Sequence, residues 1–273
     1  EIKAVIATLG GNDQVTYIKN LPTEPFVNNP KPFFGFSDNT HFANFLWLNG
    51  IPSYYGGSLF TQLAEPSEIH PYTLGYLQHA LFDAEEIELK PSYLVWDGQL
   101  DLGWDNPEFV KKHRTYEPDG GWIWDGSRNI QGITWGGCVE SIDEILRHGL
   151  EMPSLADFNQ IVLLAETSEE LPSAEYVHRV FRALGERGVL EKVQAVLVGR
   201  PKSWEFDKQN SSEQKAEYRK RQHEVILNTI RKYNSSAPVV QNLDFGHSDP
   251  QIPMPYGKEI RLDSTSNKIF ANF

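Results

Sequence analysis

The chain has 273 residues, 40% of them hydrophobic, so it is long enough to bury the core of a globular protein. Its 25 basic and 37 acidic residues leave a net charge of −12, which argues against nucleic acid as a partner because phosphate binding needs a basic face. No apolar run approaches the roughly 20 residues of a membrane span, and the single cysteine excludes an internal disulfide and a multi-cysteine metal site. A reducing cytoplasm fits this cysteine content.

The first third of the sequence predicts alternating strands and helices, the pattern of an α/β fold. Strands are expected over residues 4–8, 32–36 and 51–55, and helices over 13–19, 38–48 and 71–82. The chain opens inside the first of these strands, at Glu1 and without an initiator methionine. A natural N-terminus rarely begins within an element, so we expect a fragment or a processed chain.

A second α/β unit is expected after an irregular stretch. Residues 91–121 are rich in Trp, Asp and Gly, which predicts an elaborated loop. Beyond it, helices are expected over 141–148, 173–187 and 212–233, and strands over 160–165, 193–198, 239–240 and 260–262. We therefore predict an N-terminal domain over 1–95, a linker or active-site loop over 96–120, and a C-terminal domain over 121–273.

Ser37 lies between a predicted strand and a predicted helix. The string from Gly35 to Asn39 keeps the first glycine of the nucleophile elbow G-x-S-x-G, with Asn39 in place of the second. A serine at such a turn exposes its hydroxyl at the end of a sheet, and the N–H groups of the following helix point at the group that it attacks. The alternative is that Ser37 is a helix N-cap, which is the commoner role of serine in such a place.

A serine nucleophile needs a base and a group that orients the base. His247 lies in a Gly- and Pro-rich loop after a short strand, where a side chain can be aimed into a cleft. Glu166 ends the apolar run 161–165, and the carboxyl ends of strands are where α/β sheets place catalysis. The alternatives are a turn histidine that bonds to its own loop and a glutamate that begins a solvated loop.

A Gly-Gly turn follows the first predicted strand, at Gly10 and Gly11. Glycine lets the backbone approach a ligand closely. An N–H group of this turn, together with that of Asp38, could bind the oxyanion formed during acyl transfer.

In their order and approximate spacing, four segments resemble the LD-carboxypeptidase family, serine peptidases with a Ser–Glu–His triad: Gly10–Gly11, Pro32–Thr40, Leu163–Ser168 and Phe245–Pro255. The resemblance runs through essentially the whole chain. The Trp-rich segment 96–135 and the string Glu166–Glu170 are most similar to the branch that confers immunity to microcin C.

The resemblance implies Ser37 as nucleophile, His247 as general base and Glu166 as its orienting carboxylate, with no cofactor and no metal. It also implies an N-terminal Rossmann-like sheet that carries the nucleophile, a C-terminal α/β domain that carries Glu166 and His247, and a homodimer. Two departures stand out. Cys138 follows Gly136 and Gly137, where relatives commonly have Asn, and the family's opening strand–helix unit is missing before Glu1.

The substrate expected from the resemblance is a small peptide conjugate, a peptidyl or aminoacyl nucleotide like microcin C, whose hydrolysis gives self-immunity or detoxification. Substrate contacts are expected at Cys138 and at the tryptophans, which stack on adenine or simply pack in the core, with Trp122 first, then Trp124, and also Trp104 and Trp135. One alternative is a muropeptide L,D-carboxypeptidase that releases terminal D-Ala in cell-wall recycling. The alternative of another class is a catalytically disabled fragment that only binds a ligand.

Overall fold

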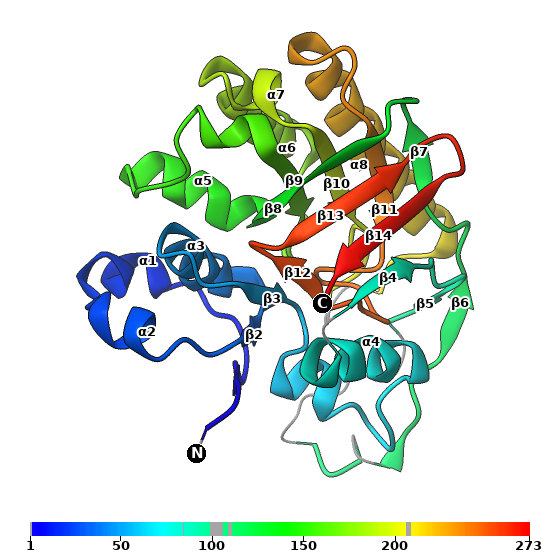
Figure 1. The fold of residues 1–273 in the computed structure, drawn as a ribbon. Helices are drawn as coiled ribbons and strands as arrows, with labels where there is room; N and C mark the ends of the chain where they lie inside the picture. Colours follow the sequence, from blue (N-terminus) through cyan, green and yellow to red (C-terminus); the bar gives the residue numbers. More distant parts are fainter. Residues whose placement is uncertain (1, 84, 99–105, 109–110, 206–208) are drawn as a thin grey trace.

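The computed structural model describes residues 2–83, 85–98, 106–108, 111–205 and 209–273. These residues form two main β-sheets flanked by helices (Figure 1). The α/β class predicted from the sequence is therefore confirmed. The helices are α1 (Gln14–Tyr17), α2 (Glu24–Asn28), α3 (Thr40–Leu48), α4 (Pro71–Phe82), α5 (Val139–His148), α6 (Ala174–Glu186), α7 (Val189–Lys192) and α8 (Ser212–Tyr233).

The smaller sheet has four strands in the order β1–β2–β3–β12. Its strands are β1 (Val5–Ile6), β2 (Phe33–Gly35), β3 (Ser53–Tyr55) and β12 (Met254–Tyr256). The first three run parallel, as βα units require, and β12 is antiparallel to β3. In Figure 1 this sheet lies with α1, α2 and α3 at the lower left of the molecule.

The larger sheet has eight strands in the order β4–β14–β13–β8–β9–β10–β11–β7. Its parallel centre consists of β8 (Ile130–Cys138), β9 (Ile161–Glu166), β10 (Ala195–Gly199) and β11 (Val239–Leu243). Antiparallel strands complete both sides, namely β13 (Glu259–Asp263), β14 (Lys268–Asn272), β4 (Glu86–Leu89) and β7 (Ile123–Asp125). Helix α6 packs between α5 and α8 beside this sheet, and β9 and β10 are buried along their whole length (Figure 1).

Helices were predicted more accurately than strands. The expected helices over 71–82 and 212–233 coincide with α4 and α8. Strands β4, β7, β8, β12 and β14 were not predicted, nor were the short strands at 94–96 and 116–118. In β8, several glycines lower the strand propensity. Packing against β9 requires two of them: a Cβ atom would lie 2.6 Å from the Gln160 carbonyl oxygen at Gly132, and 1.9 Å from the Leu164 carbonyl oxygen at Gly136.

The division into domains at residues 95 and 121 stays a prediction. Strands from each predicted domain pair with strands of the other. Strand β4 lies within residues 1–95 but pairs with β14, and β12 lies within residues 121–273 but pairs with β3. The predicted loop begins and ends in a two-stranded sheet of β5 (Leu94–Trp96) and β6 (Tyr116–Pro118). Among the described residues, no helix is long and apolar enough to cross a bilayer.

The strand ends bring the candidate residues together. Ser37 follows β2, and Cys138 and Glu166 end the neighbouring strands β8 and β9, where they are register partners. His247 lies in the loop that follows β11. Carboxyl ends of parallel strands meet at one edge of a sheet, which is the usual place for a binding site in α/β proteins.

Candidate active site

Ser37 lies in a strained turn between strand and helix. It follows β2 with a φ of 64°, in the left-handed region that non-glycine residues rarely adopt. Such a conformation costs about 1–3 kcal/mol, and a strained strand-to-helix turn is typical of a nucleophile elbow. The short 3₁₀ turn Ser37–Asn39 is capped by Phe36 without any side-chain hydrogen bond. The alternative prediction that Ser37 caps the helix is therefore wrong.

The loop after β1 approaches the serine directly. A Cβ atom on Gly10 would lie 2.8 Å from Ser37 Cβ and 3.0 Å from its Oγ, so this position requires glycine. The Asp38 carboxylate accepts hydrogen bonds from the N–H groups of Asp13 and Gln14, both at 3.1 Å, which tie the loop to the elbow. The structure thus brings the Gly10–Gly11 turn and Asp38 to Ser37, and their role as oxyanion donors stays a prediction.

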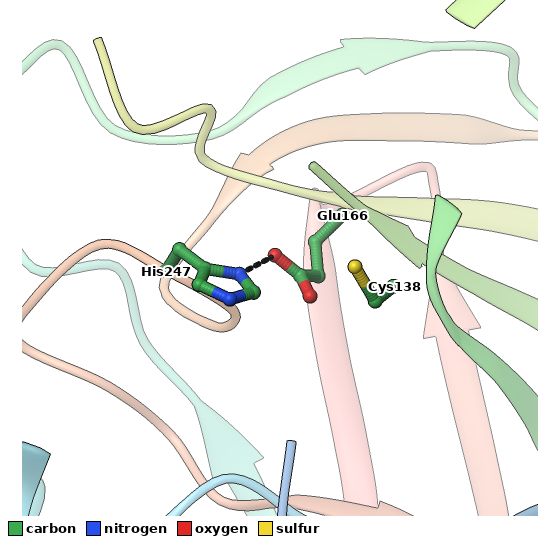
Figure 2. Close-up of side chains that lie close together, drawn as sticks. All are labelled: Cys138, Glu166 and His247. Carbon is green, nitrogen blue, oxygen red and sulfur yellow. Dashed lines mark hydrogen bonds and ion pairs between the residues drawn. The ribbon is translucent and has the colours of Figure 1, made fainter. Parts of the chain in front are cut away.

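Glu166 and His247 form a buried hydrogen-bonded pair. His247 Nδ1 lies 2.7 Å from Glu166 Oε2, and the glutamate is only 1% exposed (Figure 2). Gly246 has a φ of 94°, and a Cβ atom there would lie 2.4 Å from Glu166 Oε2. Glycine therefore lets the loop deliver His247 to the end of β9. The ring of Phe36 packs edge-on against the imidazole at 5.0 Å, which places the histidine beside the elbow.

Tyr55 is a site residue that sequence reasoning missed. Its hydroxyl donates a hydrogen bond to Glu166 Oε1 at 2.6 Å and accepts one from the N–H of Ser37 at 3.1 Å. Burial and the neighbouring Glu166 carboxylate raise the pKa of this phenol well above its usual value, so it remains a donor. The available signal was an aromatic residue at the end of a strand next to β2. Only the fold shows that it joins the serine to the glutamate.

Glu169 holds the other nitrogen of the imidazole. His247 Nε2 lies 2.9 Å from Glu169 Oε2, and within the described ranges Ser37 Oγ makes no hydrogen bond to the histidine. Burial of the ring lowers its pKa, but the carboxylates of Glu166 and Glu169 outweigh burial and raise the pKa of His247 to about 10. The interaction with His247 lowers the pKa of Glu169 to about 2. The imidazole is therefore a cation between two carboxylates at neutral pH.

A cavity of about 430 Å³ opens beside Ser37. Six of its sixteen described lining residues are acidic, and the one cation among them, Arg147, pairs with the carboxylate of Asp143. Acidic side chains reach it from the 3₁₀ turn Ser37–Asn39, from α5 and from the loop after β9. The cavity is lined by Gly11, Asn12, Ser37, Asp38, Cys138, Glu140, Ser141, Asp143, Glu144, Arg147, Ser168, Glu169, Glu170, Pro172, Ser173 and Tyr176.

Two family models match the sequence. The LD-carboxypeptidase N-terminal domain matches residues 1–56, and the LD-carboxypeptidase C-terminal domain matches residues 131–262, together more than half of the chain. The chain belongs to the LD-carboxypeptidase family. This confirms the resemblance seen in the sequence and identifies the chain as a peptidase of the carboxypeptidase kind.

Individual LD-carboxypeptidase relatives are distant but span nearly all of the chain. The microcin C7 self-immunity protein MccF of Escherichia coli is 22% identical over 98% of this chain and 73% of its own length. The putative carboxypeptidase YocD of Bacillus subtilis is 23% identical over 97% of this chain and 74% of its own.

Solved structures show the same fold. An MccF-like protein from Streptococcus pneumoniae, in complex with AMP, matches with a TM-score of 0.82 at 23% identity, covering 100% of this chain and 79% of that one. MccF in complex with aspartyl sulfamoyl adenosine matches with a TM-score of 0.78 at 20% identity, covering 100% and 76%. The chain therefore has the two-domain α/β fold of the LD-carboxypeptidases.

Cys138, which the resemblance predicts to replace an Asn of the family, lies in the cavity wall. Its thiol donates a hydrogen bond to Glu140 Oε2 at 3.1 Å, and burial together with Glu166 and Glu140 raises its pKa well above the usual value. Ligand atoms of Cys138, Glu166 and His247 lie within 4.8 Å of one another (Figure 2), and all three residue types bind zinc. The carboxylate and the imidazole already bind each other. We therefore interpret this cluster as one that positions the imidazole of His247, rather than as a zinc site.

None of the tryptophans that the structure describes lines the cavity. Trp122 Nε1 donates a hydrogen bond to Asp244 Oδ2 at 2.8 Å, and Trp124 lies on β7. Neither lines the cavity beside Ser37, and their contact with substrate stays a prediction. Trp135 is fully buried and packs in the core, whereas Trp104 lies outside the described residues.

Proposed function

We propose that this LD-carboxypeptidase hydrolyses an amide at the C-terminal end of a small peptide conjugate through an acyl-enzyme formed on Ser37. The observation that carries the proposal is the pair of Glu166 and His247 Nδ1 at 2.7 Å, beside a serine in a strained elbow. Acyl transfer requires a nucleophile, a base and a carboxylate that orients the base, and in this proposal Ser37, His247 and Glu166 supply them.

The proposed reaction starts from the neutral imidazole, after the proton on His247 Nε2 has passed to water. Ser37 Oγ then attacks the carbonyl carbon while His247 Nε2 takes the hydroxyl proton. Glu166 holds Nδ1–H and stabilises the imidazolium that forms, and Tyr55 holds the second carboxylate oxygen. N–H groups of Asp38 and the Gly10–Gly11 turn bind the developing oxyanion. The imidazolium then protonates the leaving nitrogen as the carbon–nitrogen bond breaks, and water hydrolyses the ester on Ser37. No step requires a metal or a cofactor.

The proposed substrates are aminoacyl or peptidyl nucleotides of the microcin C type. Two observations support this class: the relative named a microcin C7 self-immunity protein, and structures of MccF with aspartyl sulfamoyl adenosine and with glutamyl sulfamoyl guanosine. Cleavage of such a conjugate would detoxify it. We further propose a cytoplasmic homodimer, whose subunit number sedimentation velocity would measure.

The second candidate is a muropeptide L,D-carboxypeptidase that releases terminal D-Ala. It is supported by the family description and by relatives named putative carboxypeptidases. Parallel assays with aspartyl sulfamoyl adenosine and with a tetrapeptide ending in D-Ala separate the two candidates, because each enzyme class should turn over only its own substrate efficiently.

The test of the nucleophile is Ser37→Ala. Removing a triad serine should lower kcat by about 10⁴-fold or more while circular dichroism shows an unchanged fold. A fluorophosphonate probe should label wild type at Ser37 and leave the variant unlabelled. Equal turnover by the variant would contradict the mechanism, and absence of labelling in wild type would favour the alternative of a ligand-binding protein without catalysis.

A further inference from the structure

The contact between Glu169 and His247 blocks the proposed reaction. The base must receive the Ser37 proton on Nε2, and that atom is occupied by Glu169 Oε2 at 2.9 Å. Nδ1 cannot substitute for it, because it is bound to Glu166. Catalysis therefore requires that Glu169 leave the imidazole when substrate binds.

Glu169 is placed to make such a movement. Its side chain is 55% exposed, compared with 0% for that of Glu166, and it belongs to the loop after β9 rather than to the strand. Its carboxylate lines the cavity that also contains Ser37. Because the side chain is exposed, water can solvate the carboxylate when it leaves the imidazole, so the movement itself costs little. A cation in the cavity would then hold the carboxylate in its new position.

The cavity suggests which cation this is. Among the residues that the structure describes, six acidic ones line it against a single cation, Arg147, which pairs with Asp143. A protonated amino group of the substrate would be the missing cation. In an aminoacyl group the α-nitrogen lies about 2.5 Å from the carbonyl carbon by covalent geometry, so a substrate attacked by Ser37 carries its ammonium group into this cavity.

We propose that Glu169 recognises the free, protonated α-amino group of an aminoacyl substrate. When its carboxylate moves from His247 Nε2 to this group, the imidazolium gives its Nε2 proton to water, and Nε2 can then accept the proton of Ser37. The proposal rests on the proposed function and narrows its substrate class to conjugates with an unblocked amino group. Glu169 is a specificity-determining residue in this scheme. A substrate without the ammonium group leaves Glu169 on the imidazole and is hydrolysed slowly.

Several charged or titratable groups surround this switch. The imidazole faces Glu166 at the end of β9, Cys138 at the end of β8 and Glu169 from the following loop. Lys202, beyond β10, adds a positive charge near Glu169 that lowers its pKa further. Of these groups, Glu169 is the one that both contacts Nε2 and lines the cavity.

The kinetic test compares alanyl sulfamoyl adenosine with its N-acetyl derivative. We expect wild type to show a kcat/KM at least tenfold lower for the acetylated compound, and Glu169→Gln to reduce this ratio to less than threefold. The matched control is Glu170→Gln, which removes the same charge from the same cavity without touching His247. It should keep the wild-type ratio. Tenfold discrimination by Glu169→Gln would overturn the proposal.

A binding test keeps this inference separate from the proposed function. In Ser37→Ala, the NMR signal of the His247 imidazole, assigned by its loss in His247→Asn, should shift when alanyl sulfamoyl adenosine is added and should stay unchanged with the acetylated compound. Such a shift in the absence of any wild-type turnover would support recognition by Glu169 and refute the hydrolase. Binding of the free amine without a shift would refute the role of Glu169.

Discussion

The two sides of the His247 ring differ in how firmly they are held. On the Nδ1 side, Glu166 ends a buried strand and is fixed by the hydroxyl of Tyr55. On the Nε2 side, Glu169 lies only three residues further along the chain, half-exposed, at the edge of a cavity. The same type of side chain therefore serves two purposes. A buried carboxylate can orient a base permanently, whereas an exposed one can exchange partners because water and substrate compete for it.

The largest effect on kcat is expected from a substitution on the buried Nδ1 side of the His247 ring. Glu166→Gln preserves the shape of the side chain but removes the charge that stabilises the imidazolium. We expect kcat to fall by about 10⁴-fold, as for the carboxylate of a serine-protease triad. Steady-state kinetics on the aminoacyl nucleotide measures this loss. A fall of less than tenfold would show that Glu166 does not orient the base.

The next effect tests the loop that delivers the histidine. Gly246→Ala places a Cβ atom against Glu166 and forces alanine into a positive φ. We expect kcat to fall about 100-fold, because small displacements of a catalytic group have effects of this size. Thermal unfolding should also show a loss of about 1–2 kcal/mol. The control is Gly75→Ala in α4, where a Cβ atom meets open space and where alanine should stabilise the helix.

A smaller effect on kcat is expected when Glu166 keeps its charge but loses a hydrogen bond that holds it. Tyr55→Phe removes the hydroxyl that holds Glu166 Oε1 and accepts the N–H of Ser37. The loss of a hydrogen bond to a charged group is worth about 1.5–3 kcal/mol, so kcat should fall roughly 10- to 100-fold. KM should change little if the tyrosine only positions the triad. A change in KM alone would instead place Tyr55 in substrate binding.

The smallest effect concerns the exposed side and appears in the pH profile. Since the carboxylates of Glu166 and Glu169 raise the pKa of His247 to about 10, kcat/KM should rise with pH until the free enzyme loses this proton. Glu169→Gln removes one of these charges, lowers the pKa of the imidazole and moves the rise to lower pH. Glu170→Gln should leave the profile in place. Coincident pH profiles for wild type and Glu169→Gln would show that Glu169 does not affect the pKa of His247.

The sequence allowed accurate prediction where a local pattern was sufficient. Helix α8 carries a capping box at Ser211 and ends where predicted, and the apolar run before Glu166 forms a buried strand. The predicted glycine turn lies against Ser37, and the role of this turn and of Asp38 as oxyanion donors stays a prediction. Strand β8 escaped prediction because its glycines are required by contacts with β9, which are formed only in the folded chain.

By itself the sequence determined the α/β class and the candidate groups Ser37, Glu166 and His247, because alternating periodicity, an elbow string and a carboxylate after an apolar run are local features. Which groups touch was decided by the tertiary structure. Tyr55 reaches Glu166 across 111 positions, and Glu169 takes the Nε2 atom expected to face Ser37. Hydrogen bonds between distant strand ends depend on register and packing, and no pattern within one segment encodes them.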